Sequence, residues 1–115
     1  MTWEVEVSDE FIEWYAALSK VEQKDVATGV GMLERYGPEL GRPYVDTLNG
    51  SRFPNLKELR VQHQGRPYRI VFAFDPRRKA YLILGGDKAE DKNWYVGAIL
   101  RADAIYAQHL KEIGE

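Results

Sequence analysis

The stretch that decides the fold is NLKELRVQHQGRPYRIVFAFD, residues 55–75. Apolar and polar residues alternate on both sides of Gln64 and Gly65, a pattern typical of two β-strands joined by a tight turn. A turn centred on those two residues places Arg60 directly opposite Arg69. Like charges across a β-ladder destabilise a hairpin, so this pair needs an explanation.

The hydrophobic pattern fixes the register of the hairpin. Leu59 and Ile70 pair on one face, which we expect to contact the core. A slip of one residue would mix apolar and polar side chains on both faces, so it is disfavoured. The same register places Arg60 beside Arg69 on the other face, which we expect to face solvent. Two adjacent guanidinium groups on a rigid sheet form a binding site for a phosphate or a carboxylate.

Acidic residues offer a second explanation for the arginine pair. Glu58 shares the face of Arg60 and Arg69 in this register. Glu4 and Glu6 alternate with apolar residues in a further strand that can lie near the hairpin. Either source of carboxylates would neutralise the arginines as a surface network, and the pattern alone does not choose between the two explanations.

The rest of the chain predicts an α+β fold. Ser8 begins one helix, and the capping box of Ser19 and Glu22 begins a second helix, which ends at Gly37. Gly29 and Gly31 suggest close packing between these two helices. The expected strands are residues 3–7, 56–63, 67–74 and 80–84, and a closing helix begins near residue 94. We therefore expect an N-terminal strand and a helical hairpin packed on a twisted, mainly antiparallel sheet of about four strands, with a C-terminal helix.

Length and composition indicate one domain, residues 1–115. The absence of cysteine excludes disulfides and thiolate chemistry and suits a reducing cytoplasm. No apolar run is long enough to span a membrane. Residues 1–51 carry four basic and ten acidic residues, whereas residues 52–92 carry ten basic and five acidic residues. A basic segment within an acidic chain can form a local positive surface. His63 and His109 have no acidic or histidine neighbour at metal-ligand spacing, so we expect both to be structural or surface residues and expect no metal site.

The run LKELRVQHQGRPYRIVFAFDPRRKAYLILGGDK, followed by ADAIYAQHL, resembles the HigB-like, phage-related branch of the RelE/ParE superfamily of bacterial toxins. The resemblance implies a RelE-like fold and a toxin of a type II toxin–antitoxin pair. Relatives in the RelE and HigB branches cleave mRNA in the translating ribosome, whereas the ParE branch poisons DNA gyrase. The implied partner is a HigA-like antitoxin with an Xre-type helix-turn-helix fold.

The resemblance also implies residue roles. Arg60 matches the arginine of the family's E-L-R strand, and Arg69 matches the arginine of its Y-R-hydrophobic strand. Lys88 matches the first lysine of a loop that often reads Gly-Phe-x-Lys-Lys. Here the phenylalanine is replaced by Gly86 and the second lysine by Ala89, which lowers the local positive charge.

We expect a metal-free cleavage that needs no cofactor. Arg60 and Arg69 would hold the scissile phosphate, and Lys88 would be a second phosphate ligand or an acid. Glu58 would act as the base or orient Arg60, and Tyr95 is a further candidate acid. Four residues are expected to contact RNA: Lys57, Arg66, Lys92 and Trp94. The competing interpretation is a gyrase inhibitor, or an inactive module that only binds antitoxin.

Overall fold

The computed structural model describes residues 2–90 and 93–115. Its strands are β1 (Val5–Val7), β2 (Val45–Thr47), β3 (Lys57–His63), β4 (Arg66–Phe74) and β5 (Ala80–Asp87). Its α-helices are α1 (Asp9–Ala16), α2 (Lys20–Tyr36) and α3 (Trp94–Glu112), and short 3-10 turns cover Gly37–Glu39 and Lys88–Glu90. No helix among the described residues is both long enough and apolar enough to cross a membrane.

The strands form one sheet in the order β1-β5-β4-β3-β2, in which β1 runs parallel to β5 and all other neighbours are antiparallel. The predicted hairpin register is confirmed, because Leu59 pairs with Ile70 and Arg60 pairs with Arg69. The sheet has five strands rather than four, because the short extended segment before the hairpin pairs with β3 as β2. β5 also continues to Asp87, so the prediction that it ends at residue 84 was wrong.

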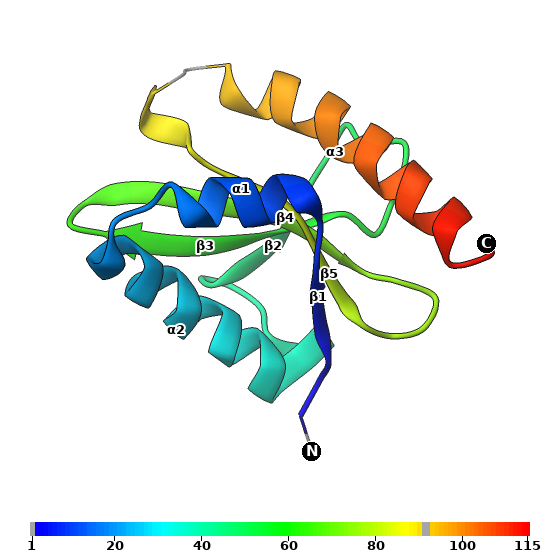
Figure 1. Cartoon of the computed structure of the whole chain (residues 1–115), viewed down its shortest axis with the longest axis horizontal. Coiled ribbons are helices and arrows are strands. Elements are labelled where there is room, and N and C mark those ends of the chain that lie inside the picture. Colours follow the sequence, from blue (N-terminus) through cyan, green and yellow to red (C-terminus); the bar gives the residue numbers. More distant parts are fainter. Residues whose placement is uncertain (1, 91–92) are drawn as a thin grey trace.

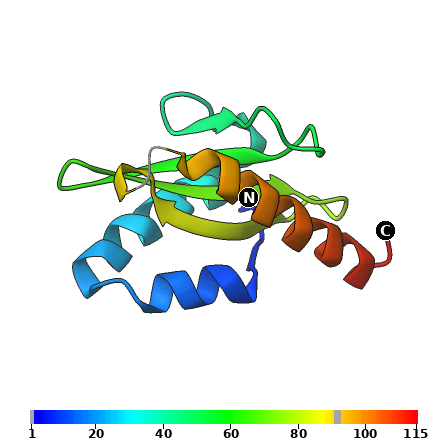
Figure 2. The ribbon, with the colours of Figure 1, turned by 90° about the horizontal axis from the view of Figure 1, so that it is seen from above.

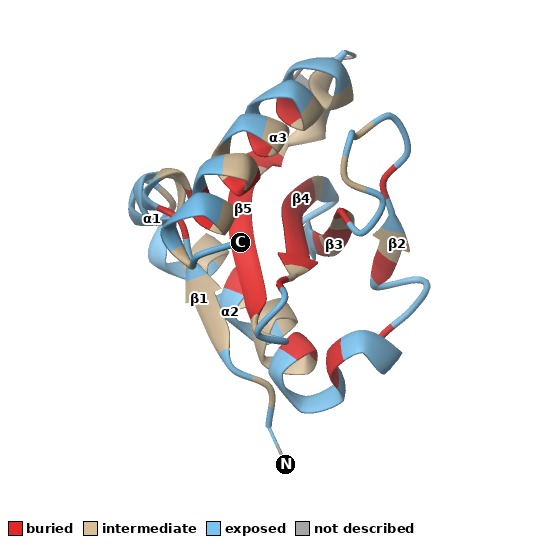
Figure 3. Ribbon diagram, turned by 90° about the vertical axis from the view of Figure 1, so that its right-hand side faces the viewer, coloured by how far each residue is buried: buried red, intermediate tan, exposed pale blue. Residues whose placement is uncertain are grey.

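Helices cover both faces of the sheet (Figures 1 and 2). α1 and α2 bury one face around residues such as Leu33, Leu59 and Phe72. α3 buries the other face through Ala102 and Tyr106. Figure 3 shows β4 and β5 buried along their length between these two layers.

The face of the arginine pair is therefore only partly open to solvent: the expectation of a solvent-facing surface was wrong for Arg69 and Glu58, whereas Arg60 remains partly exposed. Val71 and Ala73 lie on this face of β4 and are fully buried in the cluster that contains α3. A strand that is covered on both faces reads as a continuous apolar run rather than an alternating one. The stretch from Ile70 to Phe74 has this character, so the signal was present in the sequence.

The predicted helix starts are confirmed. The Ser8 side chain accepts a hydrogen bond from the Phe11 N–H, and Ser19 forms the capping box with Glu22. Gly29 was expected to pack closely against the first helix, and this was wrong. A Cβ at Gly29 would lie 2.9 Å from Val61 Cγ2 of β3, so the close neighbour is the sheet. The helix backbone thus approaches the sheet closely at this point.

Candidate functional site

The arginine pair lies at the centre of a group of ionic side chains. Arg69 Nε lies 3.1 Å from Glu58 Oε1, and Arg60 Nη2 lies 3.8 Å from Glu58 Oε2. Arg60 Nη2 also donates to Asp46 Oδ2 at 3.2 Å. Glu58 is thus the nearer partner of Arg69 and Asp46 the nearer partner of Arg60, although Glu58 also forms an ion pair with Arg60. Glu4 and Glu6 do not approach the pair; they contact Lys79 instead.

Burial differs sharply between the two arginines. The side chain of Arg60 is 33% exposed, but those of Arg69 and Glu58 are only 7% and 6% exposed. Among the described residues, neither arginine Nε has a hydrogen-bond partner, and both atoms are buried; Arg69 Nε lies at ion-pair distance from Glu58 but does not form a hydrogen bond with it. A buried donor without an acceptor costs about 1–3 kcal/mol. An anion would reach these donors only after the groups that cover them had moved.

Tyr95, at the start of α3, covers this group. Its hydroxyl donates to Glu58 Oε1 at 2.6 Å and lies 3.2 Å from Glu58 Oε2. Burial, followed by the hydrogen bond to Glu58, raises the pKa of Tyr95 above its ordinary value. Lys88 Nζ lies 5.5 Å from the centre of the Tyr95 ring, a cation–π distance. The structure therefore brings together five of the predicted site residues: Glu58, Arg60, Arg69, Lys88 and Tyr95.

The sequence did not identify Asp46 as a residue of the site. It lies on β2, pairs across the ladder with Glu58, and contacts Arg42 Nη2 at 3.0 Å as well as Arg60. The hydrogen bond from Arg42 and then that from the Thr47 N–H hold the pKa of Asp46 below its usual value. No local pattern identifies Asp46, because its contact with Arg60 depends on how β2 joins the sheet.

A hollow of about 720 Å³ opens at the hairpin end of the sheet, lined from the α1–α2 side by residues such as Trp14 and Tyr68 and from the other side by Trp94; Arg69 itself does not line it. It adjoins Arg69 through Gly86, which pairs with Arg69 across β4 and β5. A Cβ on Gly86 would lie 2.4 Å from Trp94 Nε1, and a Cβ on Gly85 would lie 2.4 Å from Trp14 Cε3. The two glycines are therefore needed for an indole to pack on each side of β5, and they do not form a turn.

The remaining predicted RNA contacts are scattered. Arg66 lines the hollow and donates from Nε to Asp87 Oδ2 at 2.5 Å, and Trp94 lines it as well. Lys57 lies on the opposite face of β3, the face of Leu59. Lys92 lies outside the described residues. Tyr68 packs in the core between the sheet and the α1–α2 helices, and its hydroxyl donates to Glu22.

Both histidines are buried and have a carboxylate partner that is distant in the sequence, which agrees with the structural role predicted for them. His63 Nδ1 lies 2.5 Å from Asp25 Oδ2, and His109 Nε2 lies 3.0 Å from Asp75 Oδ2. These partners are 38 and 34 residues away in the chain, so spacing could not reveal them.

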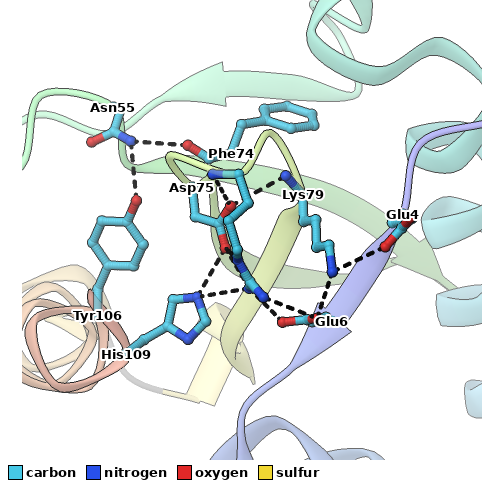
Figure 4. A network of polar contacts seen from close by, with 9 residues as sticks. Glu4, Glu6, Asn55, Phe74, Asp75, Lys79, Tyr106 and His109 are labelled. Atoms are coloured by element: carbon cyan, nitrogen blue, oxygen red, sulfur yellow. Dashed lines mark hydrogen bonds and ion pairs between the residues drawn. The ribbon is translucent and has the colours of Figure 1, made fainter. Parts of the chain in front are cut away.

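The contact of His109 belongs to a network between α3, β1 and the β4–β5 loop (Figure 4). Glu6, Asp75 and His109 present ligand atoms within 4.8 Å of one another. Arg77 Nη2 already lies 2.6 Å from Glu6 Oε1 and 2.7 Å from Asp75 Oδ2, so a guanidinium occupies the place of a cation. Burial alone would raise the pKa of Asp75, but hydrogen bonds from His109 and Arg77 outweigh it and lower the pKa. The network is structural.

Comparison with known proteins agrees with this fold and sequence. Residues 13–107 match the family of phage-derived Gp49-like proteins. Two proteins of Mycobacterium tuberculosis named as candidate toxins are similar in sequence. HigB3 is 50% identical over 91 residues, which are 78% of each chain. HigB2 is 44% identical over 101 residues, which are 86% of this chain but only 50% of that protein.

Two solved structures share the fold. A double variant of the E. coli toxin RelE in its free state superposes with a TM-score of 0.63 at 11% identity, over 88% of this chain and 97% of that one. A RelE–RelB complex from Pyrococcus horikoshii contains a chain that superposes with a TM-score of 0.56 at 18% identity, over 79% of this chain and all of that one. The chain therefore belongs to the phage-derived Gp49-like family, together with the HigB relatives, and it has the fold of RelE.

Proposed function

We propose that the protein is the toxin of a type II toxin–antitoxin pair and that it cleaves mRNA on the translating ribosome. The observation that carries the proposal is the adjacency of Arg60 and Arg69, each with a buried Nε that lacks a hydrogen-bond acceptor. A phosphate oxygen is an acceptor of the right charge for both groups. The names of the M. tuberculosis relatives support the toxin role.

The two arginines would act on the phosphate in different ways. Arg60 is one-third exposed, so it is the guanidinium that a phosphate meets first. Arg69 is nearly buried and would reach the phosphate only when Tyr95, which covers the site, moves. Together they would stabilise the charge that develops on the phosphate, at about 3–4 kcal/mol for each preorganised donor.

Proton transfer would fall to the neighbouring groups. Glu58 lies between the arginines and is the carboxylate that would accept the ribose 2′-hydroxyl proton. Lys88 lies beside Tyr95 and would be a second phosphate ligand or the acid for the leaving oxygen. The Tyr95 hydroxyl already donates a hydrogen bond to Glu58, so we assign Tyr95 the role of holding Glu58 in place. The ribosome would position the RNA, since orientation of the reacting groups alone can remove a large part of the activation barrier.

Bases next to the cleaved phosphate would bind in the hollow beside Gly86. Trp94 presents an indole there, and Arg66 supplies a guanidinium at the same rim. Base stacking on aromatic side chains is worth about 1–3 kcal/mol per base and tolerates any sequence.

The burial of Arg69 supports a second candidate, a toxin fold without nuclease activity. In the free protein, Glu58 partly neutralises Arg69 and Tyr95 covers both. Such a protein would act by binding, as a DNA gyrase inhibitor or only as a partner of the antitoxin.

One experiment separates these functions. Purified protein is added to ribosomes translating a defined mRNA, and the new 5′ ends are mapped. We expect cleavage within translated codons, and no cleavage with the Arg60→Ala variant. Uncut mRNA, together with loss of supercoiling by DNA gyrase in a parallel assay, would contradict the nuclease and favour the gyrase inhibitor.

A further inference from the structure

The arginine pair belongs to a row of residues that crosses the sheet. Gly86 of β5 pairs with Arg69 of β4, and Arg69 pairs with Arg60 of β3. The Arg60 N–H donates to the Tyr44 carbonyl at 2.7 Å, so Tyr44 continues the row just before β2. Neighbouring strands lie about 4.8 Å apart, so the row is about 14 Å long. Gly86 lines the hollow that contains Trp94, and Tyr44 lies at the β2 edge of the sheet.

A second hollow, of about 350 Å³, opens at this edge between the end of α2 and the segment before β2. Tyr36 and Tyr44 line it and are 46% and 45% exposed. Among the described residues, they are the only aromatic residues that stand exposed. The Tyr44 side chain makes no hydrogen bond or ring contact within the described part of the chain. We call this surface the tyrosine hollow.

Arg42 joins the tyrosine hollow to the arginine pair. It lines the hollow, and its Nη2 lies 3.0 Å from Asp46 Oδ2. Arg60 Nη2 lies 3.2 Å from the same oxygen, so one carboxylate holds both guanidinium groups. The Arg42 side chain is 78% exposed, and most of its N–H donors remain available to an anion.

The charges around the hollow separate a place for a base from a place for a phosphate. Glu39 lines the hollow together with Arg42, so a phosphate inside it would meet a carboxylate. At the rim, Arg42 offers a phosphate the exposed guanidinium that adjoins Arg60. Inside, the tyrosine rings offer flat faces on which any base can stack. Arg35 lies 5.4 Å from the centre of the Tyr36 ring and adds a second positive charge there.

We propose that Arg42 and the tyrosine hollow bind the RNA nucleotide on the other side of the cleaved phosphate from the hollow at Gly86. Its base stacks on Tyr44, and its phosphate binds Arg42. The RNA then crosses the sheet along the row, with Arg60 and Arg69 between two aromatic sites. This inference rests on the proposed function, because the bound strand is the substrate of the proposed nuclease.

Continuity with the arginine pair favours RNA over a protein partner as the occupant. An RNA strand with a phosphate at Arg60 that continues away from Gly86 leaves the sheet past Arg42, because Asp46 holds the two guanidinium groups together. A protein partner bound in the tyrosine hollow would leave the affinity for RNA independent of Arg42 and Tyr44.

An RNA that cannot be cleaved tests the stacking part of the proposal. The probe is a short, fluorescein-labelled single strand with 2′-O-methyl ribose throughout, and its binding to the intact protein is measured by fluorescence anisotropy. Tyr44→Ala is expected to weaken binding by about tenfold, since one stacked base is lost. Tyr44→Phe keeps the ring and is expected to bind as the wild type does. A loss of affinity that Tyr44→Phe shares overturns stacking.

The salt dependence of binding tests the phosphate part. Arg42→Ala is expected to weaken binding and to reduce the slope of the logarithm of affinity against the logarithm of salt concentration by about 0.7, because one phosphate contact is lost. Tyr44→Ala is expected to leave that slope unchanged. The matched control is Arg101→Ala, an exposed arginine on α3 outside the hollow, which is expected to bind as the wild type does.

The two levels of inference fail separately, because the probe reports binding and the ribosome assay reports cleavage. Wild-type affinity in both Tyr44→Ala and Arg42→Ala overturns the tyrosine hollow as an RNA site, and cleavage on ribosomes would still support the nuclease. A wild-type protein that does not bind the probe also overturns the site and favours a protein partner there. Binding that depends on Tyr44 and Arg42, without cleavage, supports the site and contradicts the nuclease.

Discussion

The hydroxyl of Tyr95 donates to Glu58 Oε1 at 2.6 Å and thereby joins the first turn of α3 to the strand that carries the arginine pair. Glu58 in turn lies 3.1 Å from Arg69 Nε. The start of α3 therefore covers the site by a polar contact rather than by apolar packing alone. A phosphate that binds Arg69 competes with Glu58 for the guanidinium. The hydrogen bond from Tyr95 to Glu58 opposes the movement of Glu58 away from Arg69.

Tyr95→Phe tests this contact. The variant keeps the ring but removes the donor, so Glu58 loses a hydrogen bond in a buried place. We expect the free energy of unfolding to fall by about 1–3 kcal/mol, measured by urea denaturation. We expect cleavage to persist, because the hydroxyl is assigned to Glu58 and not to the substrate. A loss of cleavage of about 100-fold or more would instead make Tyr95 the proton donor.

The arginines are expected to differ in their effect on stability. Arg60→Ala should change the free energy of unfolding by less than about 1 kcal/mol, because the side chain is partly exposed. Arg69→Ala should destabilise the fold by about 3–5 kcal/mol, because it leaves Glu58 buried without its cation. Both should abolish cleavage, so a stable but inactive Arg60→Ala variant is the cleaner evidence for a role in chemistry.

A double variant resolves the ambiguity at Arg69. Arg69→Leu combined with Glu58→Leu removes both buried charges, and we expect its melting temperature to recover relative to Arg69→Ala. Cleavage should remain absent although the fold is restored. If cleavage returned with the fold, the pair would be structural only.

The glycines of β5 give a test of packing. Gly86→Ala and Gly85→Ala place a methyl group 2.4 Å from Trp94 and Trp14 respectively, and each should cost about 1–3 kcal/mol of stability. Gly31→Ala is the control, because nothing lies within 4 Å of a Cβ there. This helix substitution should stabilise the protein by up to about 1 kcal/mol. Equal effects at all three positions would contradict the packing described for β5.

Asp75 should make stability depend on pH. Its pKa is lowered in the folded protein, so its contribution is present above its unfolded pKa, about 3.9, and is lost as the pH falls below that value. Asp75→Asn should therefore cost about 3 kcal/mol at pH 7, because it breaks a buried ionic network. The difference from the wild type should shrink at pH 3, measured by urea denaturation at both pH values. A difference that does not depend on pH would show that the charge of Asp75 is unimportant.

The sequence determined the helix starts and the register of the β3–β4 hairpin because both follow from local patterns. Alternation on either side of Gln64 and Gly65 sets which residues pair, so Arg60 had to meet Arg69. The capping residues Ser8 and Ser19 set the helix starts for the same reason.

Only the tertiary structure decided what surrounds the arginine pair. The contacts of Arg60 with Asp46 and of Glu58 with Tyr95 join residues that are 14 and 37 positions apart in the chain. Which helix covers the second face of the sheet depends on how α3 docks after β5, and no local pattern encodes that docking. Burial of Arg69 follows from the same event, since a side chain becomes buried only when another element packs over it.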